Sequence, residues 1–216
     1  MKKILMLTAA ICTCGTLAQA AAPFNGWSVG LHGGWNQDRV EVKSDEINDT
    51  KKTFNTGFAG IHFDWTKSRA NAFLFGFGLN LGHGFGTPDV TVAEADGDKL
   101  SLEFKRNLYA SIDARLGWNF NNKWALYGIL SARAQGTKLR AKVTENGVER
   151  KGEEKSDVLY GFAPGVGFDV RLNERWSLGA QYKYYFDSSV TAKASDADNK
   201  VKFRSHNALV RVSYHF

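Results

Sequence analysis

The sequence has 216 residues, of which 43% are hydrophobic and 23% charged, and its formal net charge at pH 7 is +6. These values exclude a disordered chain, and no apolar run after the first 22 positions reaches the roughly 18 residues that a membrane-spanning helix needs. The 22 glycines and the aromatic content of 13% favour β-structure, because helices disfavour glycine and strands favour aromatic residues.

The first 20 residues form a predicted bacterial signal peptide. Two lysines precede an apolar stretch at residues 4–17, and the small-x-small motif Ala18-Gln19-Ala20 follows. We predict cleavage after Ala20, with Ala22 as the alternative, so that one mature domain covers residues 21–216.

Both cysteines lie inside the predicted signal peptide, and the mature chain therefore contains none. This excludes disulfides, thiolate catalysis and thiolate metal sites from the mature protein. Positive and negative residues are interleaved along the chain, so we predict no nucleic-acid partner.

The rest of the chain repeats one unit, in which a segment of alternating apolar and polar residues is followed by a turn or a polar loop. In the segment from Leu100 to Phe120, Ile112 and Leu116 share one face while Ser111 and Asp113 share the other. A helix would scatter both sets, so the alternation predicts strands. In chain order, the eight predicted strands cover residues 27–36, 59–65, 73–82, 100–120, 124–137, 161–172, 176–187 and 207–216.

Two of these segments depart from simple alternation. In the fifth, Tyr127 and Ile129 share a face with Ser131 and Arg133, so the lumen face is ambiguous. In the sixth, Pro164 lies on the apolar face and cannot donate a ladder hydrogen bond. We therefore predict a local bulge or kink at this proline.

The connections between the predicted strands alternate in length. Short connections of turn-forming residues occupy 66–71, 121–123 and 173–175. Long polar connections, which have few large apolar residues to bury and are expected to be mobile, occupy 41–52, 87–99, 139–157 and 188–200. The pattern predicts an all-β fold, an eight-stranded antiparallel up-and-down transmembrane β-barrel with short periplasmic turns and long extracellular loops.

Side-chain volume indicates which face points outward. A soluble lipocalin-like barrel would place the apolar face inside, but an eight-stranded barrel holds far fewer large side chains than this face offers. The polar face, rich in glycine, serine and asparagine, is therefore expected to line the lumen.

Tryptophan positions support the same orientation. Five of the 6 tryptophans lie beside the start of the first strand or beside the short turns. They predict an aromatic girdle at one membrane interface. The five are Trp27, Trp65, Trp118, Trp124 and Trp176.

The signal peptide, a first strand running from Gly26 to Trp35, the eight alternating segments and the terminal Tyr214-His215-Phe216 together resemble a known family. The chain is similar to the small outer-membrane β-barrel proteins of the opacity and outer-membrane protein A type. The resemblance covers the mature chain and is specific for architecture rather than activity. It implies that the last strand is the sorting signal read by the outer-membrane assembly machinery, carried by Val210, Val212, Tyr214 and Phe216.

Charged residues of both signs lie on the predicted lumen face. In a narrow, poorly hydrated space they should pair, because an unpaired buried charge is costly. We predict a salt-bridge network that stiffens the barrel, with a conducting path for small ions as the alternative. Its members are Asp64, Glu103, Lys105, Asp113, Arg115, Arg133, Asp169, Arg171, Lys183 and Arg211.

The sequence indicates no catalytic, metal or cofactor site. His32 and His62 are expected to be lumen histidines, and Ser205 and His206 point to opposite faces of one strand. We predict a non-enzymatic integral outer-membrane protein, a structural component of the envelope that presents its loops outside. The alternatives are a narrow porin and a barrel enzyme acting on lipid A or peptides. Expected partners are outer-membrane lipid, lipopolysaccharide and the assembly machinery, and a host or surface ligand of the loops is left open.

Overall fold

The computed structural model describes residues 24–43, 50–68, 72–86, 89–95, 98–145, 148–188, 190–194 and 197–216. The expected signal peptide and its cleavage sites lie outside these ranges. The described chain forms strands only, and none of its residues belongs to a helix that could cross a membrane. The strands are β1 (Gly26–Lys43), β2 (Thr50–Ser68), β3 (Phe73–Phe85), β4 (Asp89–Ala95), β5 (Asp98–Phe120), β6 (Trp124–Glu145), β7 (Val148–Arg171), β8 (Trp176–Asp187), β9 (Val190–Ala194) and β10 (Ala197–His215).

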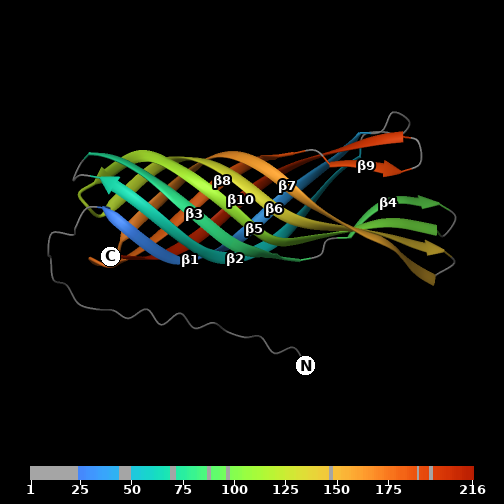
Figure 1. Ribbon diagram of the computed structural model, residues 1–216, viewed down its shortest axis with the longest axis horizontal. Helices are drawn as coiled ribbons and strands as arrows, with labels where there is room; N and C mark the ends of the chain where they lie inside the picture. Colours follow the sequence, from blue (N-terminus) through green and yellow to red (C-terminus); the bar gives the residue numbers. More distant parts are fainter. Residues whose placement is uncertain are drawn as a thin grey trace, which may run out of the picture.

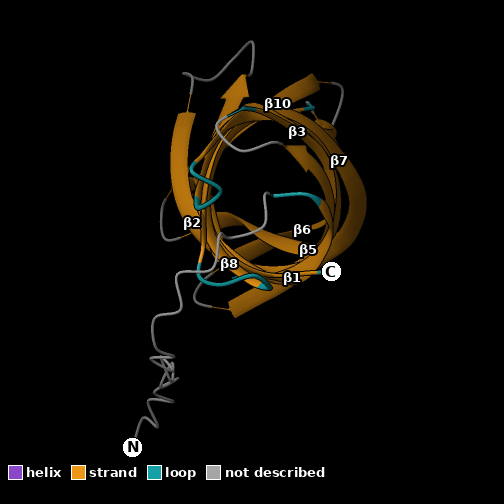
Figure 2. Ribbon diagram, turned by 90° about the vertical axis from the view of Figure 1, so that its left-hand side faces the viewer, coloured by secondary structure: helices purple, strands orange, loops and turns teal. Residues whose placement is uncertain are grey.

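Eight of these strands close into a barrel. Their order is β1-β2-β3-β5-β6-β7-β8-β10, and β1 pairs with β10 from Ser28↔His215 to Lys43↔Lys200. Every pairing is antiparallel, and the view along the barrel shows the closed ring (Figure 2). The short strands β4 and β9 follow β3 and β8 and extend the ladders of β5 and β10. The predicted eight-stranded antiparallel barrel is confirmed.

The strands connect through tight turns at one end of the barrel, which we call the short-turn end. Between β5 and β6, Asn121 and Asn122 have φ of 50° and 57°, and the Lys123 N–H donates to the Phe120 carbonyl at 3.1 Å. Asparagine tolerates positive φ at both central positions of such a turn. After β7, the backbone N–H groups of Arg175 and Trp176 both donate to Asn173 Oδ1, each at 2.9 Å, which closes the turn to β8.

The opposite end, which we call the long-hairpin end, differs from the prediction. The segments expected to be loops at 41–52, 87–99, 139–157 and 188–200 are largely strand, as in the ladder of β6 and β7 that runs to Glu145↔Val148. Strand ends project beyond the barrel there (Figure 1). The loop prediction was wrong because a strand with two polar faces shows no apolar alternation, although its backbone pairs normally.

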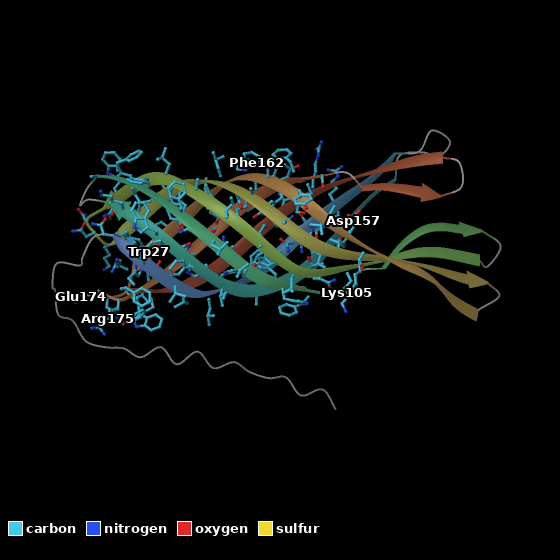
Figure 3. All side chains as sticks on the ribbon, viewed as in Figure 1. Trp27, Lys105, Asp157, Phe162, Glu174 and Arg175 are labelled. Atoms are coloured by element: carbon cyan, nitrogen blue, oxygen red, sulfur yellow. The ribbon has the colours of Figure 1, made fainter. Side chains whose placement is uncertain are left out.

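A bulge in β5 reverses which residues face the lumen. The register between β5 and β6 shifts between Arg106 and Tyr109. On the short-turn side of this shift, Ser111 and Asp113 are buried as predicted, but beyond it Arg106 is buried, at 1% exposure, and Lys105 is exposed. One extra residue moves every later side chain to the other face. The prediction that Lys105 faces the lumen is therefore wrong, and its side chain lies on the outer wall (Figure 3).

Pro164 does not cause the predicted bulge. The ladder of β6 and β7 passes through Leu130↔Pro164 without a register shift there. The pairing of β7 with β8 keeps one register from Phe162↔Phe186 to Gly165↔Lys183, although residues 163 and 164 form no pairs with β8. Because proline lacks an N–H, it interrupts this ladder without displacing it.

The two faces of the barrel wall have opposite polarity. Large apolar side chains such as Leu31, Ile112 and Phe162 are exposed on the outside, whereas the lumen is filled mainly by polar groups. The ambiguous face of β6 is resolved, since Tyr127 and Ile129 are buried in the lumen beside the polar residues of that strand. Polar residues inside and apolar residues outside are typical of transmembrane barrels.

Candidate functional site

The lumen holds two clusters of buried ion pairs, which we call the larger and the smaller cluster. The larger cluster contains three acids and three bases, namely Asp64, Asp113, Asp169, Arg115, Lys183 and Arg211. The smaller cluster contains two of each, namely Asp38, Asp187, Arg106 and Arg133. Each cluster is therefore neutral by itself, which avoids the cost of an uncompensated buried charge.

Asp64 links two arginines in the larger cluster. Its Oδ1 accepts from Arg115 Nη2 at 2.8 Å, and its Oδ2 accepts from Arg211 Nη2 at 2.6 Å. The Arg211 Nε then lies 3.6 Å from Asp169 Oδ1. These charge-assisted contacts connect β2, β5, β7 and β10 across the lumen, because the four residues come from four different strands.

Asp113 is the other acceptor centre of the larger cluster. Lys183 Nζ donates to it at 2.6 Å, Ser131 Oγ at 2.7 Å and Asn80 Nδ2 at 3.1 Å. Three donors from three strands satisfy both carboxylate oxygens. This residue therefore fixes the positions of β3, β6 and β8 around β5.

The smaller cluster lies closer to the long-hairpin end. Arg106 donates to Asp38, to Gln135 Oε1 at 2.8 Å and to Ser205 Oγ at 3.0 Å. Arg133 donates to both oxygens of Asp187, at 2.8 and 2.9 Å. Its guanidinium carbon also lies 3.7 Å from the centre of the Tyr185 ring, so the cation is held by a salt bridge and an aromatic face together.

The structure does not place all ten predicted network residues together. Seven lie in the two clusters, whereas Arg171 lies apart, where its guanidinium donates to the Glu174 carbonyl. Lys105 is outside the barrel, and the side chain of Glu103 lies outside the described part of the chain.

The predicted network lacked three of the ten cluster members, namely Asp38, Arg106 and Asp187. Asp187 lies at the last position of the predicted strand 176–187. Asp38 lies beyond the expected end of the first strand, although it keeps the spacing of the lumen residue Asn36. Arg106 is the one charged residue on the apolar face of the predicted strand 100–120. This exception to the alternation indicates the bulge, which turns the Arg106 side chain into the lumen.

Little free space remains between the clusters. The lumen cavity is about 20 Å³, which is room for about one water molecule. Its lining includes His32, Tyr109, Ser111, Lys183 and Tyr185. The lumen is thus packed by side chains, as expected for a barrel of eight strands.

Phe24 closes the short-turn end of the lumen. Its side chain is 3% exposed and forms an apolar cluster with Leu74, Ala125, Tyr127 and Ile129. The Ser68 hydroxyl donates to the Phe24 carbonyl at 3.2 Å, which attaches this residue to the end of β2. The chain preceding β1 therefore contributes to the packed interior.

One serine, histidine and aspartate meet inside the barrel. His62 Nε2 lies 2.9 Å from Ser213 Oγ and 3.9 Å from Asp64 Oδ2. A hydrolytic relay needs the acid at Nδ1 and the serine at Nε2, but here both contacts use Nε2. Ser213 is also buried from any substrate. In the described ranges, no group of three or more acidic, histidine or cysteine residues could hold a metal ion.

The five predicted interface tryptophans lie near the short-turn end. Trp27 and Trp65 are directly paired across β1 and β2, and Trp27 stacks on Phe63 with ring centres 4.9 Å apart. Trp118 is exposed, as are Trp124 and Trp176. Figure 3 shows Trp27 at this end and Phe162 on the outer wall towards the middle of the barrel.

A family model described as the outer membrane protein beta-barrel domain matches residues 6–216. The chain belongs to this family. No curated protein matches the sequence.

Solved structures similar to this outer membrane barrel include the following three. The attachment invasion locus protein Ail of Yersinia pestis is 18% identical with a TM-score of 0.44, over 89% of this chain and 99% of that one. OprG of Pseudomonas aeruginosa is 15% identical with a TM-score of 0.46, over 90% and 98%. The protease OmpT of Escherichia coli is 6% identical with a TM-score of 0.45, over 89% and 97%.

The last strand of this outer membrane barrel closes the ring. Val210 and Val212 are exposed on the outer wall, Tyr214 is half-buried, and Phe216 is exposed at the chain end. The Phe216 N–H donates to the Trp27 carbonyl at 3.0 Å, so the terminal residue is paired with the first strand. The apolar side chains therefore remain on the outer surface, while the backbone completes the seam.

Proposed function

We propose that the protein is a non-enzymatic integral component of the outer membrane, exported by a cleaved signal peptide. The observation that carries the proposal is the packed, charge-paired lumen inside a wall whose outer face is apolar. Ion pairs that bridge several strands stiffen a barrel, whereas a transport function needs an open path. This arrangement supports a structural role.

In this proposal the short-turn end faces the periplasm and the long-hairpin end faces the outside. The tryptophans near the short-turn end support this orientation, since aromatic residues collect at membrane interfaces and outer-membrane barrels have short periplasmic turns. The projecting strand ends would then be presented to the surroundings of the cell, where they could meet a surface ligand. The assembly machinery would recognise the terminal strand that ends at Phe216.

Planar-bilayer conductance tests the structural role against the narrow porin. We expect no resolvable channel steps from the purified protein, because the lumen cavity holds about one water molecule. Heat-modifiable migration on a gel shows separately that the barrel is folded. The positive control is Arg106→Ala, which removes a large side chain from the smaller cluster. We expect channel steps from this variant if the folded barrel can conduct once the lumen is opened. Steps from the wild-type protein would overturn the proposal in favour of a pore.

A second assay addresses the barrel enzyme. Folded protein is incubated with lipid A and with a peptide library, and the products are analysed by mass spectrometry. We expect no turnover, because the buried His62 and Ser213 lack relay geometry and access. Turnover that survives His62→Ala would place an active site elsewhere, and turnover abolished by it would show that the lumen group is catalytic.

A further inference from the structure

The small lumen cavity lies between the two ion-pair clusters and is lined by a cation from each. Lys183 belongs to the larger cluster and Arg133 to the smaller one. Their carboxylate partners, Asp113 and Asp187, do not line the cavity, and none of the described residues in its lining is acidic. The electrostatic potential inside the cavity is therefore positive, although each cluster is neutral as a whole.

Two nitrogen atoms of the lining have no hydrogen-bond partner within the described chain. They are Arg133 Nε and His32 Nδ1, and both are buried. Arg133 uses its Nη2 for both bonds to Asp187, at 2.8 and 2.9 Å. The Nε of an arginine always carries a hydrogen and can only donate. A buried donor without an acceptor is costly, so this atom calls for a ligand that accepts a hydrogen bond.

His32 is positioned to supply a second donor. Its Nε2 lies 2.5 Å from the Tyr109 hydroxyl. A hydrogen bond from this hydroxyl to Nε2 leaves the proton of the neutral imidazole on Nδ1. Two glycines make room for the pair, since a Cβ at Gly60 would lie 2.8 Å from His32 Nε2 and one at Gly82 would lie 2.6 Å from the Tyr109 oxygen. The backbones of β2 and β3 therefore fix the ring beside the cavity.

The size and the lining of the cavity together define the class of ligand. A volume of about 20 Å³ admits one particle of about the size of a water molecule. The cationic lining and the unpartnered donors favour an anion that only accepts hydrogen bonds. A multivalent anion would add too much charge to a neutral interior. Chloride is monovalent, only accepts hydrogen bonds and is little larger than water, so it meets these conditions.

We propose that the lumen cavity binds one chloride ion. Arg133 Nε and His32 Nδ1 donate to the ion, and the positive charge of Lys183 contributes to holding it. The ion connects the larger cluster to the smaller one across the lumen. It stabilises the folded barrel, because the unfolded chain has no such site. The site lies inside the wall, so it does not depend on which end of the barrel faces outward.

Chloride-dependent stability tests the proposal. The folded protein in lipid vesicles is unfolded with urea while chloride replaces gluconate at constant ionic strength, from about 1 to about 300 mM. Because one ion binds, the equilibrium constant for folding should rise about tenfold for each tenfold increase in chloride above the dissociation constant. Bromide should act in the same way. An equilibrium constant that stays unchanged over this range would overturn the proposal.

His32→Phe and His62→Phe form a matched pair of variants. Both histidines are buried in the lumen, and in the described structure both have an unpartnered Nδ1, but His62 does not line the cavity. His32→Phe removes a donor to the ion, so the chloride concentration needed for a given stabilisation should rise at least about tenfold. His62→Phe should lower stability and leave the chloride dependence unchanged. An equal change in both variants would show that chloride acts elsewhere.

Diffraction from crystals grown with bromide locates the ion without any substitution. We expect an anomalous peak inside the lumen, between Lys183 and Arg133. A water molecule at this position, with bromide only on the protein surface, would overturn the site. The conductance and turnover assays do not depend on this ion, so a wrong proposed function is distinguished from a wrong chloride site.

Discussion

Replacing Ile112 by arginine tests whether the apolar outer wall meets lipid. Ile112 is 63% exposed on β5, between Leu79 and Ala132 on the neighbouring strands. From Trp118 the strand rises about 16 Å to this residue, close to the middle of a band about 25 Å tall. An arginine near the bilayer midplane costs about 2–4 kcal/mol, so we expect a loss of about 3 kcal/mol in the free energy of unfolding.

The assay is equilibrium unfolding by guanidinium chloride of protein reconstituted in lipid vesicles. Leu108→Arg is the matched control, because Leu108 is 70% exposed on the same strand but lies about 26 Å from Trp118, at the edge of the band. There the cost should be only about 0–1 kcal/mol. Equal costs at the two positions, or a cost below about 1 kcal/mol at Ile112, would refute the assignment of this wall to the membrane.

Three further predictions concern the lumen, the chain end and the orientation. Arg106→Leu should destabilise the barrel by about 3–5 kcal/mol by leaving Asp38 buried and unpaired, and adding Asp38→Leu should recover part of this loss in the same unfolding assay. Deleting Phe216 should leave export intact but lower the amount of folded protein in the outer membrane, measured by fractionation; normal membrane levels would contradict a sorting role. An epitope inserted between residues 146 and 147 should be labelled on intact cells, whereas one after Asn122 should not, and the reverse result would invert the barrel.

The sequence was sufficient to predict the barrel because its strands have unlike faces. Alternation identifies each of the eight strands of the barrel wall, and the volume of the side chains on the apolar face indicates that this face points outward. Where both faces are polar, as in the outer parts of β6 and β7, the same signal disappears and strand was mistaken for loop. Backbone pairing leaves no trace in residue types there.

The candidate site was predictable residue by residue only where the register is regular. Asp64 and Asp113 follow the alternation and lie in the lumen, but the bulge in β5 exchanges the positions expected for Lys105 and Arg106. A bulge is set by local backbone geometry and tertiary packing, which periodicity does not encode. The sequence also does not show which acid pairs with which base in each cluster, because the pairing depends on the relative heights of strands that are far apart in the chain.

The separate neutrality of the two lumen clusters constrains how the interior can change over evolutionary time. Loss of one charge in the smaller cluster, such as Arg133, can be compensated by a change at Asp187 but not by a distant change at Asp64. Substitutions inside the barrel should therefore be inherited as coupled pairs within a cluster. The outer wall, which faces a fluid solvent of acyl chains, is free to exchange one apolar residue for another singly. The lumen residues should therefore be substituted slowly and in coupled pairs, whereas the residues of the outer wall should be substituted one at a time.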